Sequence, residues 1–218
     1  MKSTRVYLYL LAALSLELGC MGVRPIASPQ PAPRSTDSAE NLIDMLGHAY
    51  RTMDFTLYRT LFANLKDHGV EFHFILDQPT AAGETQWGYE EEMRIHRRMF
   101  QPQVLAAGEE QVPAGLWPQS IACKLTRMQD FTERFDLYRS EQNPMGELDR
   151  HRWRATDAVY ATSVLWSTQG GMAFRVEGAA RFVVIEALTK AAGEPGKFLV
   201  YRWEDLGSGE NGMAKASR

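Results

Sequence analysis

Cysteine is scarce in this chain, which contains 2 cysteines, Cys20 and Cys123, among 218 residues. If Cys20 is acylated, as argued below, Cys123 has no partner and a disulfide framework is excluded. Cys123 shares an alternating apolar stretch with Ile121 and Leu125. That setting predicts a buried, unreactive thiol rather than a catalytic nucleophile.

An excess of basic residues is absent as well. The sequence contains 24 Lys and Arg residues and 27 Asp and Glu residues, which gives a net charge of −3. A broad positive surface is therefore excluded, and we expect no nucleic-acid partner. The 5 histidines lack the short spacing of metal ligands, and the sequence has neither a glycine-rich phosphate loop nor a Gly-x-Ser-x-Gly elbow. We expect neither a metal nor another cofactor.

The N-terminus carries the most specific local signal. Lys2 and Arg5 precede the apolar run VYLYLLAALSL, which is typical of a signal peptide and shorter than the roughly 20 residues of a permanent membrane span. The stretch LELGC resembles a lipobox, which implies acylation of Cys20 and a membrane anchor. Glu17 departs from that pattern, so simple secretion or an uncleaved anchor are the alternatives. We expect a bacterial cell-envelope protein, in the periplasm or on the outer surface.

Composition divides the chain into four parts. Residues 1–20 are predicted to be the signal peptide, and residues 21–36, with four prolines, an extended linker. Residues 37–206 are predicted to form one folded domain. Residues 207–218 are small and polar, which predicts a disordered tail.

The first half of the domain has the apolar spacing of helices. Asp37 with Glu40 predicts the start of the first helix, and Asp54 the start of a second that ends near residue 68. The stretch VEFHFILD alternates like a half-buried strand. A third helix is predicted over residues 88–101.

From residue 119 onward the apolar period changes to two. Strands are predicted near residues 120–138, 154–168, 172–189 and 197–206. Gly170 and Gly171 predict a hairpin between the second and third of these. Helices first and long antiparallel strands afterwards predict an α+β fold.

This order of elements resembles the NTF2-like (SnoaL-like) superfamily. AYRTMDFTLYRTLFANL is similar to the opening of many SnoaL-like domains, FLVYRWEDL resembles the final strand, and WGYEEEMRIHRRMF resembles the third helix of lipid-anchored members. The resemblance implies an NTF2-like cone, in which three N-terminal helices pack on a strongly curved antiparallel or mixed sheet around a pocket. Homodimers through the sheet are common among such proteins. The superfamily includes isomerases, cyclases, dehydratases, hydrolases and proteins without known activity, so the fold does not give the function.

Members that resemble ketosteroid isomerase have a tyrosine on the first helix and an aspartate base beyond the second. Here the first helix offers Leu46 nearest the tyrosine position, and Asp77 is the closest candidate for the base. The alternation of its strand places Asp77 with Glu71 and His73, away from the apolar face. A solvated strand end is the alternative to catalysis.

The stretch 121–137 supplies further candidates. Arg127, Gln129 and Glu133 lie in phase with its apolar residues, so an unbroken strand would direct them into the cone. Arg127 and Glu133 could then pair, or could orient a polar ligand group. A β-bulge that leaves these side chains in water is the alternative.

His96 lies on the apolar face of the third helix, the element that would cover the pocket. Near a carboxylate such as Glu92 or Glu133, it could act as a general base. His96, Asp77 and Glu133 are therefore the catalytic candidates. A core histidine with both nitrogens hydrogen-bonded is the alternative.

The later strands supply candidate pocket walls. Aromatic residues would form the walls, and ordinary core packing is the alternative for them. The small Gly178 leaves room for a ligand or for sheet curvature. The predicted ligand-binding residues are Arg127, Gln129, Tyr160, Trp166, Gly178 and Tyr201.

Two functional hypotheses follow. The first is a non-enzymatic envelope protein that binds a small apolar or amphipathic molecule, or a protein partner. The alternative is a metal-independent SnoaL-like enzyme, an isomerase, cyclase, dehydratase or hydrolase with acid–base residues in the pocket. Convergence of two titratable groups inside one pocket would favour the enzyme.

Overall fold

The computed structural model describes residues 36–79, 83–104, 108–188 and 197–207. The predicted signal peptide with Cys20, the linker up to residue 35 and the tail from residue 208 lie outside the described residues. Among the described helices, none is long and apolar enough to cross a membrane.

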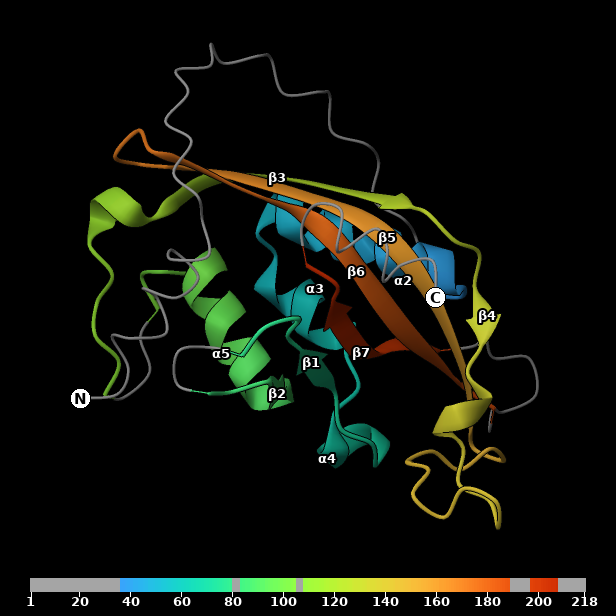
Figure 1. Cartoon of the computed structure of the whole chain (residues 1–218). Helices are drawn as coiled ribbons and strands as arrows, with labels where there is room; N and C mark the ends of the chain where they lie inside the picture. Colours follow the sequence, from blue (N-terminus) through green and yellow to red (C-terminus); the bar gives the residue numbers. More distant parts are fainter. Residues whose placement is uncertain (1–35, 80–82, 105–107, 189–196, 208–218) are drawn as a thin grey trace.

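A curved sheet forms the body of the domain, and the helices lie along its concave side (Figure 1). The strand order is β2-β1-β7-β6-β5-β3, and β4 pairs with β5 outside this path. The β1–β7 pair is parallel and the others are antiparallel, so the sheet is mixed. The strands are β1 (His73–Ile75), β2 (Gln86–Gly88), β3 (Pro118–Arg127), β4 (Thr132–Glu133), β5 (Trp153–Thr168), β6 (Ala173–Ala187) and β7 (Phe198–Asp205).

The predicted hairpin of the two longest strands is confirmed. Gly171 turns the chain between β5 and β6 with a φ of 80°, a conformation that favours glycine. The neighbouring Gly170 donates its N–H to the Gly115 carbonyl at 2.9 Å. A Cβ at position 170 would lie 2.6 Å from that oxygen, so this close contact also requires glycine.

The described residues contain four α-helices rather than the three expected. They are α2 (Ala39–Thr52), α3 (Phe55–Thr60), α4 (Leu65–His68) and α5 (Tyr89–Phe100), with two 3-10 turns, η1 (Ala114–Leu116) and η2 (Phe135–Leu137). The cap of α2 is Ser38, whose Oγ accepts the Asn41 N–H at 3.1 Å, rather than Asp37. The coarse architecture, helices on a curved mixed sheet, agrees with the predicted α+β class and NTF2-like cone.

The single helix predicted from Asp54 to residue 68 is wrong, because the chain leaves the helix after Thr60. The Val200 N–H of β7 donates to the Leu61 carbonyl at 2.8 Å, and the Ala63 N–H donates to the Val200 carbonyl at 2.9 Å. These bonds to β7 replace the helical bonds of that segment. Helix spacing in the sequence cannot reveal this competition from a strand far along the chain.

The long strand predicted over 120–138 is also wrong. After Arg127, the N–H groups of Met128 and Gln129 both donate to the single carbonyl of Val159, at 2.7 and 3.3 Å. Two residues of this segment thus lie opposite the single residue Val159 of β5. This is the arrangement of a β-bulge, and it interrupts the alternation of side chains. Beyond this point only β4 pairs with β5, and η2 follows.

A second irregularity separates residues of β7 that simple alternation would place together. Val183 of β6 pairs with Arg202, but Val184 pairs with Val200, so Tyr201 is an extra residue. Trp203 therefore packs on Phe182 on the helix side, whereas Tyr201 belongs to a cluster on the opposite face.

The main core fills the space between the helices and the concave face. It contains Leu42, Ile43 and Leu46 of α2 together with aromatic residues from α3, α5 and the sheet. Fully buried aromatic members are Tyr58, Phe62, Phe72 and Phe182.

A smaller core lies on the opposite face of the sheet. Leu137 and Leu148, from the connection between β4 and β5, pack on Val183 and Ile185 of β6. The Tyr138 hydroxyl, from the same connection, accepts the Ala155 N–H at 2.8 Å. The chain itself therefore covers part of this sheet face. The homodimer through the sheet stays a prediction, and it would have to use the uncovered part of the face.

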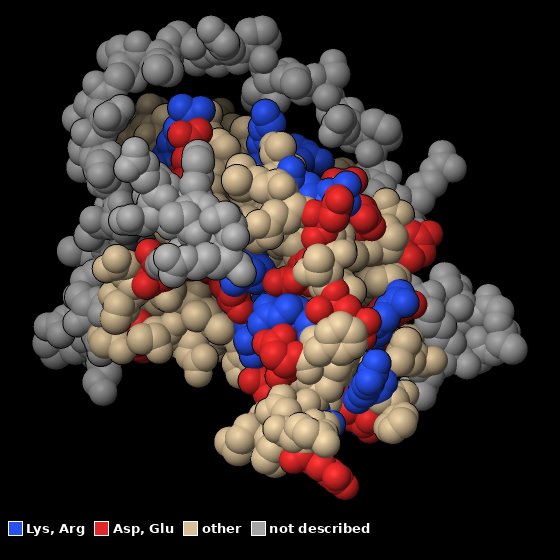
Figure 2. All heavy atoms as spheres, turned by 45° about the vertical axis from the view of Figure 1, so that its right-hand side comes forward, with Lys and Arg blue, Asp and Glu red and all other residues tan. Residues whose placement is uncertain are grey.

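A continuous series of ion pairs borders this smaller core. Successive nitrogen–oxygen distances along it range from 2.7 to 3.7 Å. On the face shown in Figure 2, basic and acidic side chains alternate without a large patch of one sign. The series runs Asp136, Arg134, Asp157, Arg181, Glu204, Arg202 and Glu147.

Replacement of Arg181 by leucine is expected to destabilise the fold by about 2 kcal/mol, because it removes a partner from the mostly buried Asp157 and Glu204. Urea denaturation at pH 7 measures this difference. The control is Arg175→Leu on the same strand and face, where the Arg175–Glu177 pair is more than half exposed. That control should change stability by less than about 0.5 kcal/mol, and equal losses in the two variants would contradict the prediction.

Candidate functional site

A buried polar cluster joins the helices to β2. Glu92 of α5 is its centre: Oε1 accepts the Tyr58 hydroxyl at 2.6 Å, and Oε2 accepts the Trp87 Nε1–H at 2.7 Å. His96, one turn along α5, places Nδ1 3.1 Å from Glu92 Oε1. Glu92 is 0% exposed, so the protein alone solvates this carboxylate.

His96 extends the cluster to α2. Its Nε2 lies 2.5 Å from the Tyr50 hydroxyl, and its ring stacks on Tyr58 with the centroids 4.3 Å apart. Phe100 packs edge-on against the same imidazole. With 7% of its surface exposed, His96 has both nitrogens directed at protein groups.

Electrostatics fix the protonation of the cluster. Burial by itself raises the pKa of the Glu92 carboxyl, but attraction to His96 and hydrogen bonds from three side chains outweigh it. The pKa of Glu92 therefore lies below its ordinary value. Burial, reinforced by the Glu92 charge, raises the pKa of Tyr50 and Tyr58 well above the usual range. At neutral pH Glu92 is therefore a carboxylate, and both phenols are neutral.

Cys123 of β3 is buried in the same core as Tyr50. Burial raises the pKa of the Cys123 thiol to about 12, although the nearby Arg51 guanidinium opposes the shift. The thiolate that a nucleophile requires is therefore suppressed. This agrees with the inert buried thiol predicted from the sequence.

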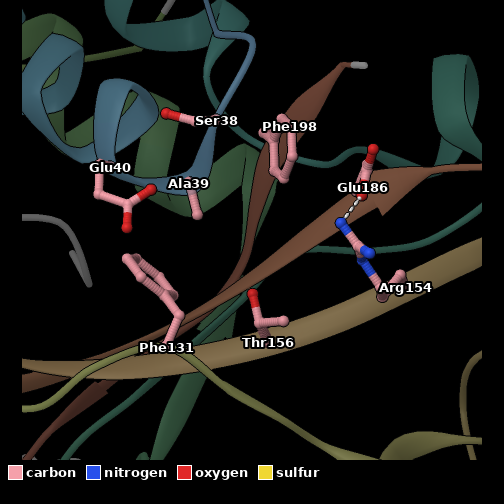
Figure 3. A pocket seen from close by; sticks show the side chains of 8 residues that line it. All are labelled: Ser38, Ala39, Glu40, Phe131, Arg154, Thr156, Glu186 and Phe198. Atoms are coloured by element: carbon pink, nitrogen blue, oxygen red, sulfur yellow. Dashed lines mark hydrogen bonds and ion pairs between the residues drawn. The ribbon is translucent and has the colours of Figure 1, made fainter.

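A second candidate site is a surface hollow of about 260 Å³ beside the start of α2 (Figure 3). It lies at the opposite end of α2 from Tyr50, about 18 Å away at 1.5 Å per residue. The lining residues are Ser38, Ala39, Glu40, Phe131, Arg154, Thr156, Glu186 and Phe198. None of them belongs to the buried cluster.

The hollow combines rings with charges. In Figure 3 the Phe131 and Phe198 rings stand on two sides of it, and the Thr156 hydroxyl points toward the space between them. Arg154 of β5 forms an ion pair with Glu186 of β6. The Arg154 side chain is 52% exposed, and the Glu186 side chain is 11% exposed. Glu40 is more exposed, at 54%, and pairs with Arg127 at 2.9 Å.

The catalytic candidates from the sequence do not form one group. His96 pairs with Glu92, one of the two carboxylates considered. Glu133 lies exposed on β4, where it accepts the Tyr138 hydroxyl at 3.2 Å. Asp77 follows β1 and lies beside Gly207 at the end of β7. The arrangement thus brings His96 to Glu92 and leaves the other two candidates in separate places.

The ligand candidates are separated in the same way. Arg127 and Gln129 are exposed, because the chain bulges at the end of β3, and Arg127 pairs with Glu40 and Asp130 instead of Glu133. The Arg127–Glu133 pair that an unbroken strand would have allowed does not form, and the alternative, a β-bulge that leaves these side chains exposed, is confirmed. Tyr201 is on the far face, where its hydroxyl donates to Glu147.

The other three ligand candidates do lie on the concave face. Tyr160 is buried in the main core and packs edge-on against Phe182. Trp166 stacks on Phe174 nearer the β5–β6 turn. Gly178 pairs with Thr162 between them. Ligand binding by these three residues stays a prediction. None of them lines the hollow at the start of α2.

Sequence reasoning missed Tyr50 and Trp87 as partners of the buried pair, and it missed most residues of the hollow. An i,i+4 spacing on one helix was the available signal for Glu92 and His96. Phe131, Arg154 and Phe198 come from three distant segments and have no local signal. Within the described ranges, no group of three or more His, Cys, Asp or Glu side chains could hold a metal ion.

No protein-family model and no curated protein matches the chain. A solved structure of a conserved protein from Planctomyces limnophilus shares 11% identity over 76% of this chain and 89% of that chain, with a TM-score of 0.45. A candidate dehydratase of the NTF2-like family from Streptomyces avermitilis shares 11% identity over 78% and 93%, with a TM-score of 0.43.

A third similar structure is a candidate aromatic ring hydroxylase from Novosphingobium aromaticivorans. It shares 14% identity over 76% of this chain and 83% of that chain, with a TM-score of 0.41. Likenesses at this level carry no argument about activity. The element order and the curved mixed sheet described above agree with the layout expected of an NTF2-like cone.

Replacement of Glu92 by glutamine should destabilise the protein by about 3 kcal/mol at pH 7, because His96 and the other donors lose their buried charged acceptor. The lowered pKa of Glu92 means that the ionised form stabilises the fold above the unfolded pKa, near 4.5. That contribution is lost as the pH falls through the lower folded value. Urea denaturation between pH 7 and pH 3 should therefore show wild type and variant converging below about pH 4.5.

The matched control is Glu91→Gln, one position earlier on α5. Its side chain is 37% exposed and pairs only with the neighbouring Arg94 among the ion pairs of the described chain. It should cost less than about 1 kcal/mol at pH 7. A pH-independent gap between Glu92→Gln and wild type would contradict a stabilising buried carboxylate.

Proposed function

We propose that this domain is a non-catalytic binding protein that takes up a small amphipathic molecule in the hollow at the start of α2. The observation that carries the proposal is the lining of the hollow, where two phenyl rings stand beside an ion pair and a hydroxyl. Binding pockets typically join an apolar wall to a few oriented polar groups. The volume of about 260 Å³ favours a ligand of modest size.

The apolar part of such a ligand would lie between Phe131 and Phe198, both half-buried. Covering the remaining exposed ring surface stabilises the complex by roughly 25 cal/mol per Å² of apolar area. The polar part would face Thr156 and the Arg154–Glu186 pair. These polar groups would orient the ligand, because an apolar group placed against them would remove their water without replacing its hydrogen bonds.

The alternative is a metal-independent acid–base enzyme that uses the Glu92–His96 pair. The separation of 3.1 Å between Glu92 Oε1 and His96 Nδ1 favours it, since a carboxylate at that distance can orient an imidazole base. Against it, both Glu92 oxygens accept hydrogen bonds from the core, and His96 Nε2 is directed at Tyr50. A substrate would have to displace these partners before proton transfer, so we favour the binding role.

The binding role predicts a small molecule that co-purifies with the wild-type protein and is absent from a Thr156→Trp variant. The indole would fill the hollow without altering the strand backbone, because Thr156 is only half-buried and faces the hollow. The measurement is native mass spectrometry of the wild-type protein and the variant, each produced as the full-length chain. We expect at least a tenfold fall in occupancy.

Ser163→Trp is the control, since it adds the same side chain to β5 on the opposite face, where Ser163 contacts Glu177. It should retain the ligand. A bound mass that persists in Thr156→Trp places the ligand elsewhere. An activity that survives Thr156→Trp and is lost in the still-folded Glu92→Gln variant would favour the enzyme instead.

We also propose that the protein is exported and held at a membrane through acylated Cys20. The proposal is supported by the basic and apolar N-terminus and the stretch LELGC. A Cys20→Ala variant should move from the membrane fraction to the soluble fraction of lysed cells, and Cys123→Ala should not. Retention of Cys20→Ala in the membrane would assign the anchoring to an uncleaved helix or to a partner.

A further inference from the structure

We propose that the ligand of the hollow is an uncharged amphipathic molecule. Its hydroxyl or amide group hydrogen-bonds to the Thr156 hydroxyl, and its apolar body lies between the Phe131 and Phe198 rings. This inference rests on the binding role proposed above and names the class of ligand. It is carried by the pairing of the charges around the hollow, the hydroxyl of Thr156 and the position of the two rings.

Each charged side chain that lines the hollow already has a partner of opposite charge. Glu40 Oε1 lies 2.9 Å from Arg127 Nη1, at the rim of the hollow. Arg154 pairs with Glu186 across β5 and β6, the one interaction drawn between side chains in Figure 3. The hollow therefore presents ion pairs to a ligand rather than a single unpaired charge.

A charged ligand would have to compete with these ion pairs. The Glu186 side chain is 11% exposed, so an anion that drew Arg154 away would take a partner from a mostly buried carboxylate. A cation would exchange one ion pair for another and would lose its own hydration as well. An uncharged ligand leaves both ion pairs in place, so the charges of the hollow favour it over either ion.

Thr156 supplies a polar group that such a ligand can use. Its hydroxyl points into the space between the rings and, among the residues drawn in Figure 3, makes no hydrogen bond. The Ser38 hydroxyl, in contrast, already accepts the Asn41 N–H at the start of α2. A hydroxyl both donates and accepts hydrogen bonds, and a ligand hydroxyl or amide can therefore pair with Thr156 in either direction.

The two rings set the position of the apolar part. Phe131 and Phe198 are half-buried and stand on two sides of the hollow (Figure 3). An apolar body between them would remove their remaining exposed surface from water. A ligand without any polar group would cover the Thr156 hydroxyl and leave it unpaired, which is unfavourable. The lining thus fits a molecule with one uncharged polar end.

The test compares three probes with the same alkyl chain: hexanol, hexylammonium and hexanoate. Isothermal titration calorimetry of the full-length protein at pH 7 should show hexanol binding at least fivefold more tightly than either ion. Thr156→Trp should abolish the binding of hexanol, because the indole fills the hollow. Ser163→Trp, on the opposite face of β5, should leave it unchanged.

Thr156→Val tests the hydrogen bond, since valine keeps the shape of threonine and removes its hydroxyl. It should weaken hexanol about fivefold, the effect of one hydrogen bond. Thr156→Ser, which keeps the hydroxyl, should stay within twofold of wild type. The matched control is Thr162→Val, farther along β5 and outside the hollow, which should have no effect. Equal affinities of Thr156→Val and wild type for hexanol would overturn the inference.

Arg154→Gln tests whether ion pairing is what excludes a cation. With this partner of Glu186 removed, hexylammonium should bind at least threefold more tightly than it binds to wild type. Arg175→Gln, which removes an exposed partner of Glu177 elsewhere on β6, should have no effect. If Arg154→Gln fails to fold, as circular dichroism would show, Arg127→Gln applies the same test at Glu40. Unchanged hexylammonium binding in the folded variant would contradict the inference.

The outcomes separate this inference from the binding role. A preference for hexylammonium or hexanoate that Thr156→Trp blocks would overturn the uncharged ligand and keep the hollow as a binding site. Hexanol binding that Thr156→Trp leaves unchanged would place the ligand elsewhere and overturn both. If no probe binds and no mass co-purifies in native mass spectrometry, the binding role fails together with the ligand class.

Discussion

The buried carboxylate of Glu92 holds together the elements that fill the concave side of the sheet. A charge removed from water is destabilising unless donors surround it, and these donors come from different parts of the chain. Tyr58 belongs to α3, Trp87 to β2, and His96 to the next turn of α5. Through His96 the cluster reaches Tyr50 of α2. One ionised group thus fixes three helices and an edge strand relative to one another.

The saturation that makes Glu92 an effective structural centre makes it a poor reactive group. A general base must reach a proton on a substrate, and here the available positions are filled by protein donors. Groups with freedom to meet a ligand lie at the other end of α2, where Glu40 and Arg154 are about half exposed. The helix therefore joins a rigid interior at Tyr50 to an adaptable surface at its first turn.

Local patterns predicted the elements of this fold well where neighbours in sequence determine them. The bounds of α5 and of the β5–β6 hairpin agree with their predictions within one or two residues. The failures share one cause, which is backbone pairing with a distant strand. Val200 interrupts the expected second helix, and Val159 accepts two N–H groups where the expected long strand bulges. The extra residue at Tyr201 reverses which face the later side chains of β7 occupy. The spacing of apolar residues along the sequence does not predict any of these backbone hydrogen bonds.

The same division explains the sites. An i,i+4 spacing on a helix places Glu92 and His96 on one face, so their pairing was within reach of the sequence. The hollow depends instead on register: Arg154 stands opposite Glu186 across β5 and β6, and Glu186 stands opposite Phe198 across β6 and β7. A shift of one residue in either pairing would send these side chains to opposite faces. Because strand register is set by the whole sheet, the binding groups of this domain follow from its long-range topology rather than from any motif.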